Sequence, residues 1–249
     1  MPTFAPLSNM FRHRGKSRTL IHNLKLASLL SFVAGIVNVS GLFAVQRLTT
    51  NVTGHFAFSA DEMAKKNFTQ GIIYLLFILA FLLGAFISNL LVEIISKINE
   101  RFVNSIPVGI EIFILTFVAL LSPTTIHTNA NEVACLLLFA MGLQNALVTS
   151  LSNSVVRTTH LTGLFTDLGI ELSQLFFYKK QEQRKKLTSS IKLRLTIIFF
   201  FFLGGVTGGF GYLLMGIKIL LLTVATLWSA LIYDSVKFKL VSIKRKYLR

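Results

Sequence analysis

Charged side chains are scarce in this sequence of 249 residues: Asp, Glu, Lys and Arg together make up only 14% of it. Soluble domains carry roughly 25% charged residues, so this chain has too few to cover a soluble surface of its size. Acidic residues are the scarcest, 10 against 25 Lys and Arg, which leaves a net charge of +15. The shortage of charge excludes an ordinary soluble domain.

Cysteine is nearly absent as well. The single Cys135 stands in an apolar run, so the chain has no disulfide framework and no cysteine-based metal cluster. No paired histidines at ligand spacing take its place, and no Ser-His-Asp set or nucleophile elbow is recognisable. We therefore expect no metal, no cofactor and no enzymatic activity.

Apolar residues are abundant, at 53% of the chain, and they form long runs without any charge, such as 71–92 and 195–217. About 20 apolar residues are enough to cross the hydrocarbon core as a helix. The sequence thus predicts an all-α polytopic membrane protein. The six predicted spans are residues 26–45, 71–92, 104–122, 133–152, 195–213 and 216–233.

Most of the basic residues lie in clusters that flank the predicted spans, whereas the polar loop at 123–132 has no Lys or Arg. This asymmetry indicates orientation by the positive-inside rule, not a nucleic-acid partner. We expect an inner-membrane protein with both termini in the cytoplasm. The predicted segments are a basic cytoplasmic leader at 1–25, a membrane repeat at 26–122, an external loop at 123–132, a second membrane repeat at 133–233 and a basic cytoplasmic tail at 234–249.

One octapeptide pattern, T-T-x-[V/L]-T-G-x-F, occurs twice. The first box, residues 49–56, reads TTNVTGHF, and the second box, residues 158–165, reads TTHLTGLF. A G-x-x-N motif precedes each box, and a glutamate follows each at the same offset. Such self-similarity indicates a diverged duplication. The repeated outer residues are Gly35, Asn38 and Glu62 in the first copy, and Gly142, Asn145 and Glu171 in the second.

Three full spans fall in each copy. Because three is odd, the second copy enters the membrane in the opposite sense, an inverted repeat that is typical of transporters and channels. In the alternative, each box crosses the membrane fully and the chain has eight spans in parallel repeats. That alternative places Lys97 and Arg101 outside, so the positive-inside rule favours six spans.

The boxes contain residues that can begin a helix within the membrane. Threonine is a good N-cap, and glycine permits a close backbone approach. We predict that Thr53 and Thr162 start half-helices, whose partly positive N-termini bind anionic groups near the midplane. The alternative is that these residues only pack helices together. The candidate solute-binding residues are Asn38, Thr53, Gly54, Gln144, Asn145, Thr162 and Gly163.

Three carboxylates fall in apolar segments, where ionisable groups are costly and by default functional: Glu111, Asp167 and Glu171. We regard them as candidates for proton or ion coupling. The glycine-rich run in the fifth span has the spacing of helix-packing motifs, not of a phosphate loop. Its packing residues are Gly204, Gly205, Gly208 and Gly209.

The G-x-x-N motif with the first box, and the run A-M-G-L-Q-N-A with the second, resemble the YoaK family of bacterial membrane proteins. The resemblance covers most of residues 25–233, and the second box matches it more closely. In the first copy, Asn38 stands where the family usually has Asp, and His55 where it has Asn. Membership implies an integral membrane protein, often described as a possible permease, and names no substrate.

The leading functional hypothesis is a small secondary transporter or channel for a small solute. The alternative is a structural or interaction protein of the membrane, in which Thr, Gly and Asn serve packing alone. A lipid-modifying enzyme would need a nucleophile or metal set, which is not visible. The expected partners are the lipid bilayer and a small solute, with self-association left open and no nucleic acid.

Overall fold

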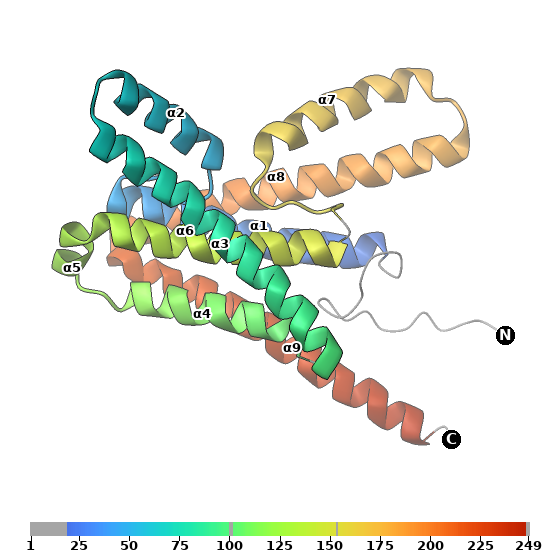
Figure 1. The fold of residues 1–249 in the computed structure, drawn as a ribbon. Coiled ribbons are helices and arrows are strands. Elements are labelled where there is room, and N and C mark those ends of the chain that lie inside the picture. Colours follow the sequence, from blue (N-terminus) through green and yellow to red (C-terminus); the bar gives the residue numbers. More distant parts are fainter. Residues whose placement is uncertain (1–18, 100–101, 153, 248–249) are drawn as a thin grey trace.

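The described part of the chain is helical throughout. A computed structural model describes residues 19–99, 102–152 and 154–247, and within these ranges it contains helices and no strands (Figure 1). The elements are α1 (Leu20–Val45), α2 (Val52–Ala64), α3 (Phe68–Ile98), α4 (Ser105–Ala119), α5 (Pro123–Thr128), α6 (Ala130–Ser152), α7 (Leu161–Phe177), α8 (Gln181–Met215), the 3₁₀ turn η2 (Gly216–Ile219) and α9 (Leu220–Tyr247).

Four helical stretches of the described chain are long and apolar enough to cross a membrane: α1, α3, α6 and the stretch Gln181–Asp234, which holds α8, η2 and the first part of α9. Gly216 has a φ of 62° and ends α8, so α9 turns back along the molecule (Figure 1). The helix α4 is apolar but has only 15 residues. The chain is thus a membrane-embedded helical protein.

The predicted spans all fall on helices, but several boundaries differ from the prediction. The helix α1 begins at Leu20, and α3 continues to Ile98, because a helix does not stop where its apolar run stops. The predicted external loop at 123–132 contains α5. Pro123 is the first residue of this helix, and Ser122 caps it by accepting the backbone N–H of Thr125. Residues 1–18 of the predicted leader lie outside the described residues.

The helices α1 and α8 cross in close contact. At Gly35 of α1 and at Gly204 of α8, an added Cβ would collide with a backbone carbonyl of the other helix, that of Phe201 and that of Phe32 respectively. Gly208 lies against the backbone of α1 in the same way. Only glycine permits backbones to approach this closely.

A second crossing, between α3 and α6, uses the same device. Gly84 of α3 faces the carbonyl of Phe139, and Gly142 of α6 faces the carbonyl of Phe81. The glycines of both G-x-x-N motifs, on α1 and α6, therefore lie at a helix crossing. Each of these two helices packs against a helix from the other half of the chain.

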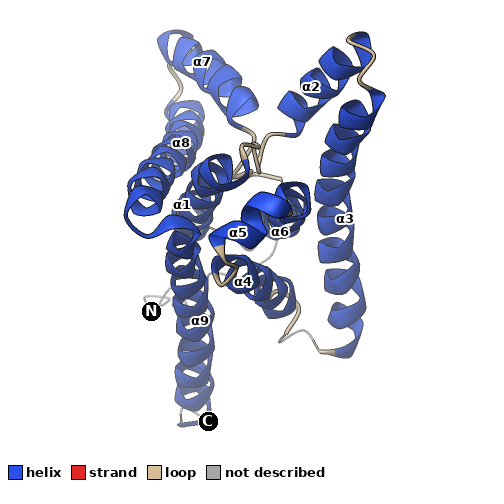
Figure 2. Cartoon of the chain, turned by 90° about the vertical axis from the view of Figure 1, so that its left-hand side faces the viewer, coloured by secondary structure: helices blue, strands red, loops and turns tan. Residues whose placement is uncertain are grey.

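The two short helices α2 and α7 begin near the middle of the molecule and diverge from there. Figure 2 shows their N-terminal ends close together and their C-terminal ends far apart, with the preceding loops meeting between them. Each packs on the helix that follows it, α2 on α3 and α7 on α8. With 13 and 17 residues, both are shorter than the roughly 20 residues of a full crossing.

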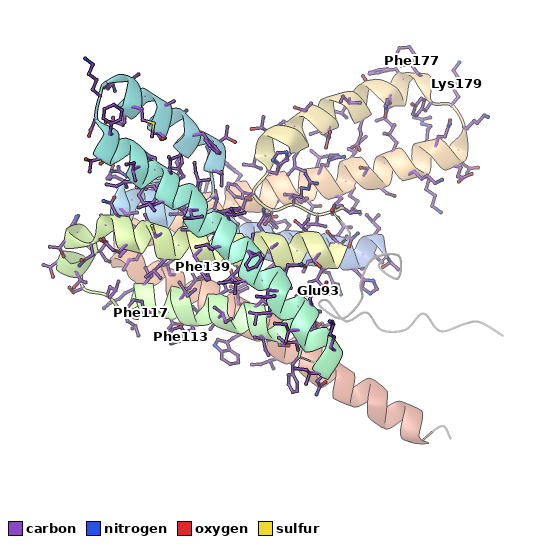
Figure 3. The ribbon with its side chains drawn as sticks, viewed as in Figure 1. Glu93, Phe113, Phe117, Phe139, Phe177 and Lys179 are labelled. Carbon is purple, nitrogen blue, oxygen red and sulfur yellow. The ribbon has the colours of Figure 1, made fainter. Side chains whose placement is uncertain are left out.

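The buried side chains gather on α1 and α6, while α3 and α8 keep many apolar side chains on the outside. Figure 3 shows Phe113 and Phe117 of α4 pointing away from the bundle, and they are 71% and 49% exposed. Phe202 and Phe210 of α8 are exposed to a similar extent. An outer surface this apolar suits contact with lipid tails.

Candidate functional site

The first box is tied to the middle of α1 by hydrogen bonds. Thr49 donates its Oγ1 hydrogen to the carbonyl of Val37 at 3.1 Å, and Thr50 donates its own to Oδ1 of Asn38 at 2.8 Å. The loop therefore doubles back along α1 and starts α2 within the bundle. The amide of Asn38, placed in an apolar helix, obtains in this way the partner that it needs.

Asn51 is the residue that begins α2. Its Oδ1 accepts the backbone N–H of Gly54 at 2.9 Å, which satisfies one of the free amides of the first turn. Thr53, expected to be the cap, lies instead at the second position of the helix, because asparagine caps as well as threonine and comes first along the chain. The same shift applies to Thr162 in α7, where His160 holds the cap position.

His55, one turn into α2, has a fully buried side chain. Its Nε2 donates to the carbonyl of Leu48 at 2.6 Å, and its ring packs against Tyr74 and Phe77 of α3. Burial, with a smaller effect of the nearby Arg47 charge, lowers the pKa of His55 below its ordinary value. The side chain thus serves as a neutral anchor of α2.

The second box shares the pattern but not the hydrogen bonds. The ring of His160 leans over Gly163 and accepts none of the amides of α7. Thr158 is fully buried, and its Oγ1 has no partner among the described residues. The same holds for the buried Oδ1 of Asn145. The second copy of the motif thus contains polar groups without a hydrogen-bond partner among the described residues.

A partly open cavity of about 1500 Å³ lies where the two boxes meet. Residues from both copies of the duplicated motif line it, and so do the first residues of α2 and α7, whose starts lie close together in Figure 2. Water-filled space lined by polar groups is where irregular backbone can exist at membrane depth. Six of the seven predicted solute-binding residues line it: Asn38, Thr53, Gly54, Asn145, Thr162 and Gly163.

Gln144 is the predicted residue that does not line the cavity. Its side chain is buried and donates from Nε2 to the carbonyl of Leu30 at 2.9 Å, so it joins α6 to α1. Glu111 does not line the cavity either. It is 1% exposed on the buried face of α4, and its Oε1 has no partner among the described residues.

Asp167 lines the cavity, and Glu171 lies one turn behind it. Both carboxylates bind Arg194 of α8: NH1 is 2.8 Å from Asp167 Oδ2, and Nε is 2.9 Å from Glu171 Oε2. Ser190 also donates to Glu171 at 2.6 Å. Two of the three predicted coupling carboxylates therefore hold α7 onto α8 at the edge of the cavity.

Among the cavity residues that are not predicted from the sequence are two arginines, Arg157 and Arg194. In the sequence both belong to the basic residues that set orientation. The spacing of Asp167 and Glu171, which places both on one helix face, is the available signal for a shared cation. Nothing in the sequence singles out Arg157, which is exposed and forms no ion pair within the described part of the chain.

Helices that start at a shared polar cavity, inside an apolar bundle, define a helical membrane protein with a central solvent-accessible site. The family model described as "Protein of unknown function (DUF1275)" matches residues 26–233, and the chain belongs to that family. This confirms the resemblance to the YoaK family. No curated protein and no solved structure matches the chain.

Proposed function

We propose that the chain is a small secondary transporter or channel for a small solute, which binds in the cavity between the two boxes. The observation that carries this proposal is that two distant copies of one motif line a single cavity. Half-helix N-termini bind the anionic groups of substrates in many transporters, and hydroxyl and amide side chains beside them can hydrogen-bond a polar solute.

The proposal includes two inverted repeats, α1–α4 and α6–α9. In support, α1 packs on α8 while α3 packs on α6, so the first helix of each repeat meets the third helix of the other. The glycines occupy corresponding places at both crossings: Gly35 with Gly204, and Gly142 with Gly84. Inverted repeats of this kind rock against each other around a fixed site.

The proposed topology has six crossings in the inner membrane, with both termini in the cytoplasm. In support, α2 is too short for a full crossing and returns to the side on which α1 ended (Figure 1). The excess of Lys and Arg in the segments assigned to the cytoplasm gives the direction.

Glu111 is the best candidate for proton or ion coupling in this scheme. Its carboxyl group is 1% exposed and has no partner for Oε1 among the described residues. Burying such a group costs free energy, so a buried carboxyl in a membrane helix is by default a functional residue. Asp167 and Glu171 share Arg194 and are better suited to fixing α7. The coupling role therefore falls on α4 and not on the cavity wall.

A second candidate function is a structural or interaction role in the membrane. The observation in its favour is that Gly35 and Gly142, the glycines of the G-x-x-N motifs, serve helix packing. A cavity of about 1500 Å³ lined by hydroxyl, amide and charged groups has no use in that role. For this reason we favour transport, and we propose no enzymatic activity.

The test is solute flux in liposomes that contain the purified full chain. Thr162→Trp should place an indole in the cavity and abolish flux, whereas Phe210→Trp, on the exposed face of α8, should leave it unchanged. Solutes are first chosen by their ability to raise the melting temperature of the protein. Absence of any flux by the wild type, with the protein folded, would leave the structural role in place.

A further inference from the structure

The first box has few polar groups left to offer a ligand. Thr49 and Thr50 donate to α1, at Val37 and Asn38, and Asn51 accepts the amide of Gly54. These hydrogen bonds fix the start of α2 from within. The first box therefore forms a rigid wall of the cavity.

The second box is open at the corresponding positions. Thr158 corresponds to Thr49, is fully buried and has no partner for Oγ1 among the described residues. Asn145 corresponds to Asn38, lines the cavity and has a buried Oδ1 without a partner. Both atoms show that the second box lacks the hydrogen bonds by which Thr49 and Thr50 tie the first box to α1. Of the two residues, only Asn145 lines the cavity. Its Oδ1 is an acceptor, so the binding of an anion must come from donors elsewhere on this wall.

The first turn of α7 is open too. His160 stands where Asn51 stands in α2, and it caps no amide. The backbone N–H groups of Leu161, Thr162 and Gly163 have no acceptor within the described part of the chain, and all three residues line the cavity. Free amides at a helix N-terminus, together with the helix dipole, attract negative charge.

The charge on the cavity wall has the matching sign. Arg157 lines the cavity, is exposed and forms no ion pair among the described residues. Asp167, the acidic residue of the wall, is already bound by Arg194, which also binds Glu171. The hydrogen-bond donors that remain available in this half of the cavity are thus the guanidinium of Arg157, the hydroxyl of Thr162 and the three backbone amides of the first turn of α7.

We propose that the second box binds a small anion, a carboxylate or an oxyanion, through the first turn of α7, Thr162 and Arg157. This inference rests on the proposed function and names the class of its substrate. The first box orients the site and contributes little binding. The two boxes differ at the residue that precedes each helix: asparagine at 51 accepts the amide of Gly54 in the first turn of α2, whereas histidine at 160 accepts no amide of α7.

The experiment is calorimetric titration of the purified full chain in detergent, in a zwitterionic buffer, with acetate and with inorganic phosphate. Acetamide, the neutral analogue of acetate, is the control solute. The wild type should bind at least one of the two anions saturably and should not bind acetamide. Arg157→Gln should weaken anion binding tenfold or more, because it removes the unpaired cation.

His160→Asn is the sharper variant. An asparagine there should accept the amide of Gly163, as Asn51 accepts that of Gly54, so anion binding should fall tenfold or more while the melting temperature rises. A merely destabilised protein cannot give that combination. His127→Asn, at an exposed position of α5 outside the cavity lining, is the matched control and should keep anion affinity within threefold.

Three results would overturn the inference: binding of acetamide as tight as that of acetate, equal losses in His127→Asn and His160→Asn, or no binding of either anion by the folded wild type. Flux of neutral or cationic solutes through the same cavity would contradict the anion site and would still support transport. Anion binding that follows the expected pattern, without flux in liposomes, would support the anion site and contradict transport.

Discussion

Single residues decide how the two copies of the motif differ. Asn51 and His160 occupy the same place in the two boxes, and the shorter side chain reaches back to its own helix while the imidazole does not. The duplicated pattern thus supplies one closed and one open helix start. A site for an asymmetric solute needs such a difference, because two identical half-sites could not tell its ends apart.

His55 shows how a titratable group is used for structure. Its Nε2 already donates to Leu48, and its Nδ1 is buried without a partner among the described residues. A proton on Nδ1 would place a charge in a buried position, away from water and near the Arg47 charge. Protonation of His55 in the folded protein is therefore disfavoured.

The stability of the protein should fall in acid because of this histidine. The folded pKa of His55 is lowered, so below the ordinary value of 6.5 the unfolded chain binds a proton that the folded chain does not. As pH falls from 6.5 toward the folded pKa, stability should drop by up to about 1.4 kcal/mol per pH unit. His55→Gln should remove this part of the pH dependence.

The measurement is the melting temperature between about pH 7.5 and 5 in detergent, a range that brackets the ordinary histidine pKa. His127→Gln, at an exposed position in α5, is the control and should leave the pH dependence unchanged. An identical acid sensitivity in His55→Gln and the wild type would mean that another group is responsible.

The place of the cavity could be predicted from the sequence, because polar residues that recur at matching places in an apolar chain indicate a shared site. Asn38 and Asn145 line the cavity together with the Thr-Gly pairs. Gln144 differs because its neighbour Asn145 takes the cavity face, and a helix turns about 100° between them. Arg157 could not be predicted, because a basic residue near a span normally indicates orientation alone.

At the scale of the helices, the short α2 and α7 are attached in different ways. On α3, α2 is held by His55 and Phe58, whose rings both pack against the ring of Tyr74. On α8, α7 is held by the ion pairs of Arg194 and a small cluster of three buried leucine and isoleucine side chains. The attachment of α7 therefore depends more on charge than that of α2.

The packing of the long helices depends instead on glycines, which leave room for the two backbones where the helices cross. Gly204→Ala would put a methyl group into the carbonyl of Phe32, so we expect a loss of about 1–3 kcal/mol in stability, as for other overpacked sites. Gly169→Ala is the matched control, because an added Cβ there meets open space in α7.

The control should gain about 0.5–1 kcal/mol, since alanine is the better helix former. Both variants can be compared by thermal or denaturant unfolding in one detergent. If Gly204→Ala proved as stable as Gly169→Ala, the close approach of α1 and α8 would not matter for folding.

The helices themselves could be predicted from the uncharged runs, as 71–92 within α3 and 133–152 within α6 illustrate. Their partners could not. That α1 meets α8 and not α2 or α3 depends on Gly35 matching a glycine far along the chain, and no local periodicity contains that information. The short helix α5 is not predicted because proline usually ends a helix, although it also begins helices.

The whole molecule can work as a transporter of this kind only if its two halves have opposite directions. In Figure 1, α2 runs from the middle toward one end of the bundle and α7 runs toward the other. If the bundle crosses the membrane along that direction, the two helices open toward opposite faces. The connection α3–α4 and the connection through α5 then also lie on opposite faces, which can be tested directly.

Accessibility labelling of two single cysteines tests this arrangement in a Cys135→Ser background, which removes the one native thiol. Thr124→Cys, exposed at the start of α5, should react with a membrane-impermeant maleimide added from outside. Ile98→Cys, 78% exposed at the end of α3, should react only after the membrane is permeabilised, because Lys97 and its neighbours are expected to remain in the cytoplasm. The reverse pattern would contradict six crossings with both termini in the cytoplasm and would favour the eight-span alternative, which places Lys97 and Arg101 outside. Labelling of both sites from one side would place the two connections on the same face and remove the inverted repeat.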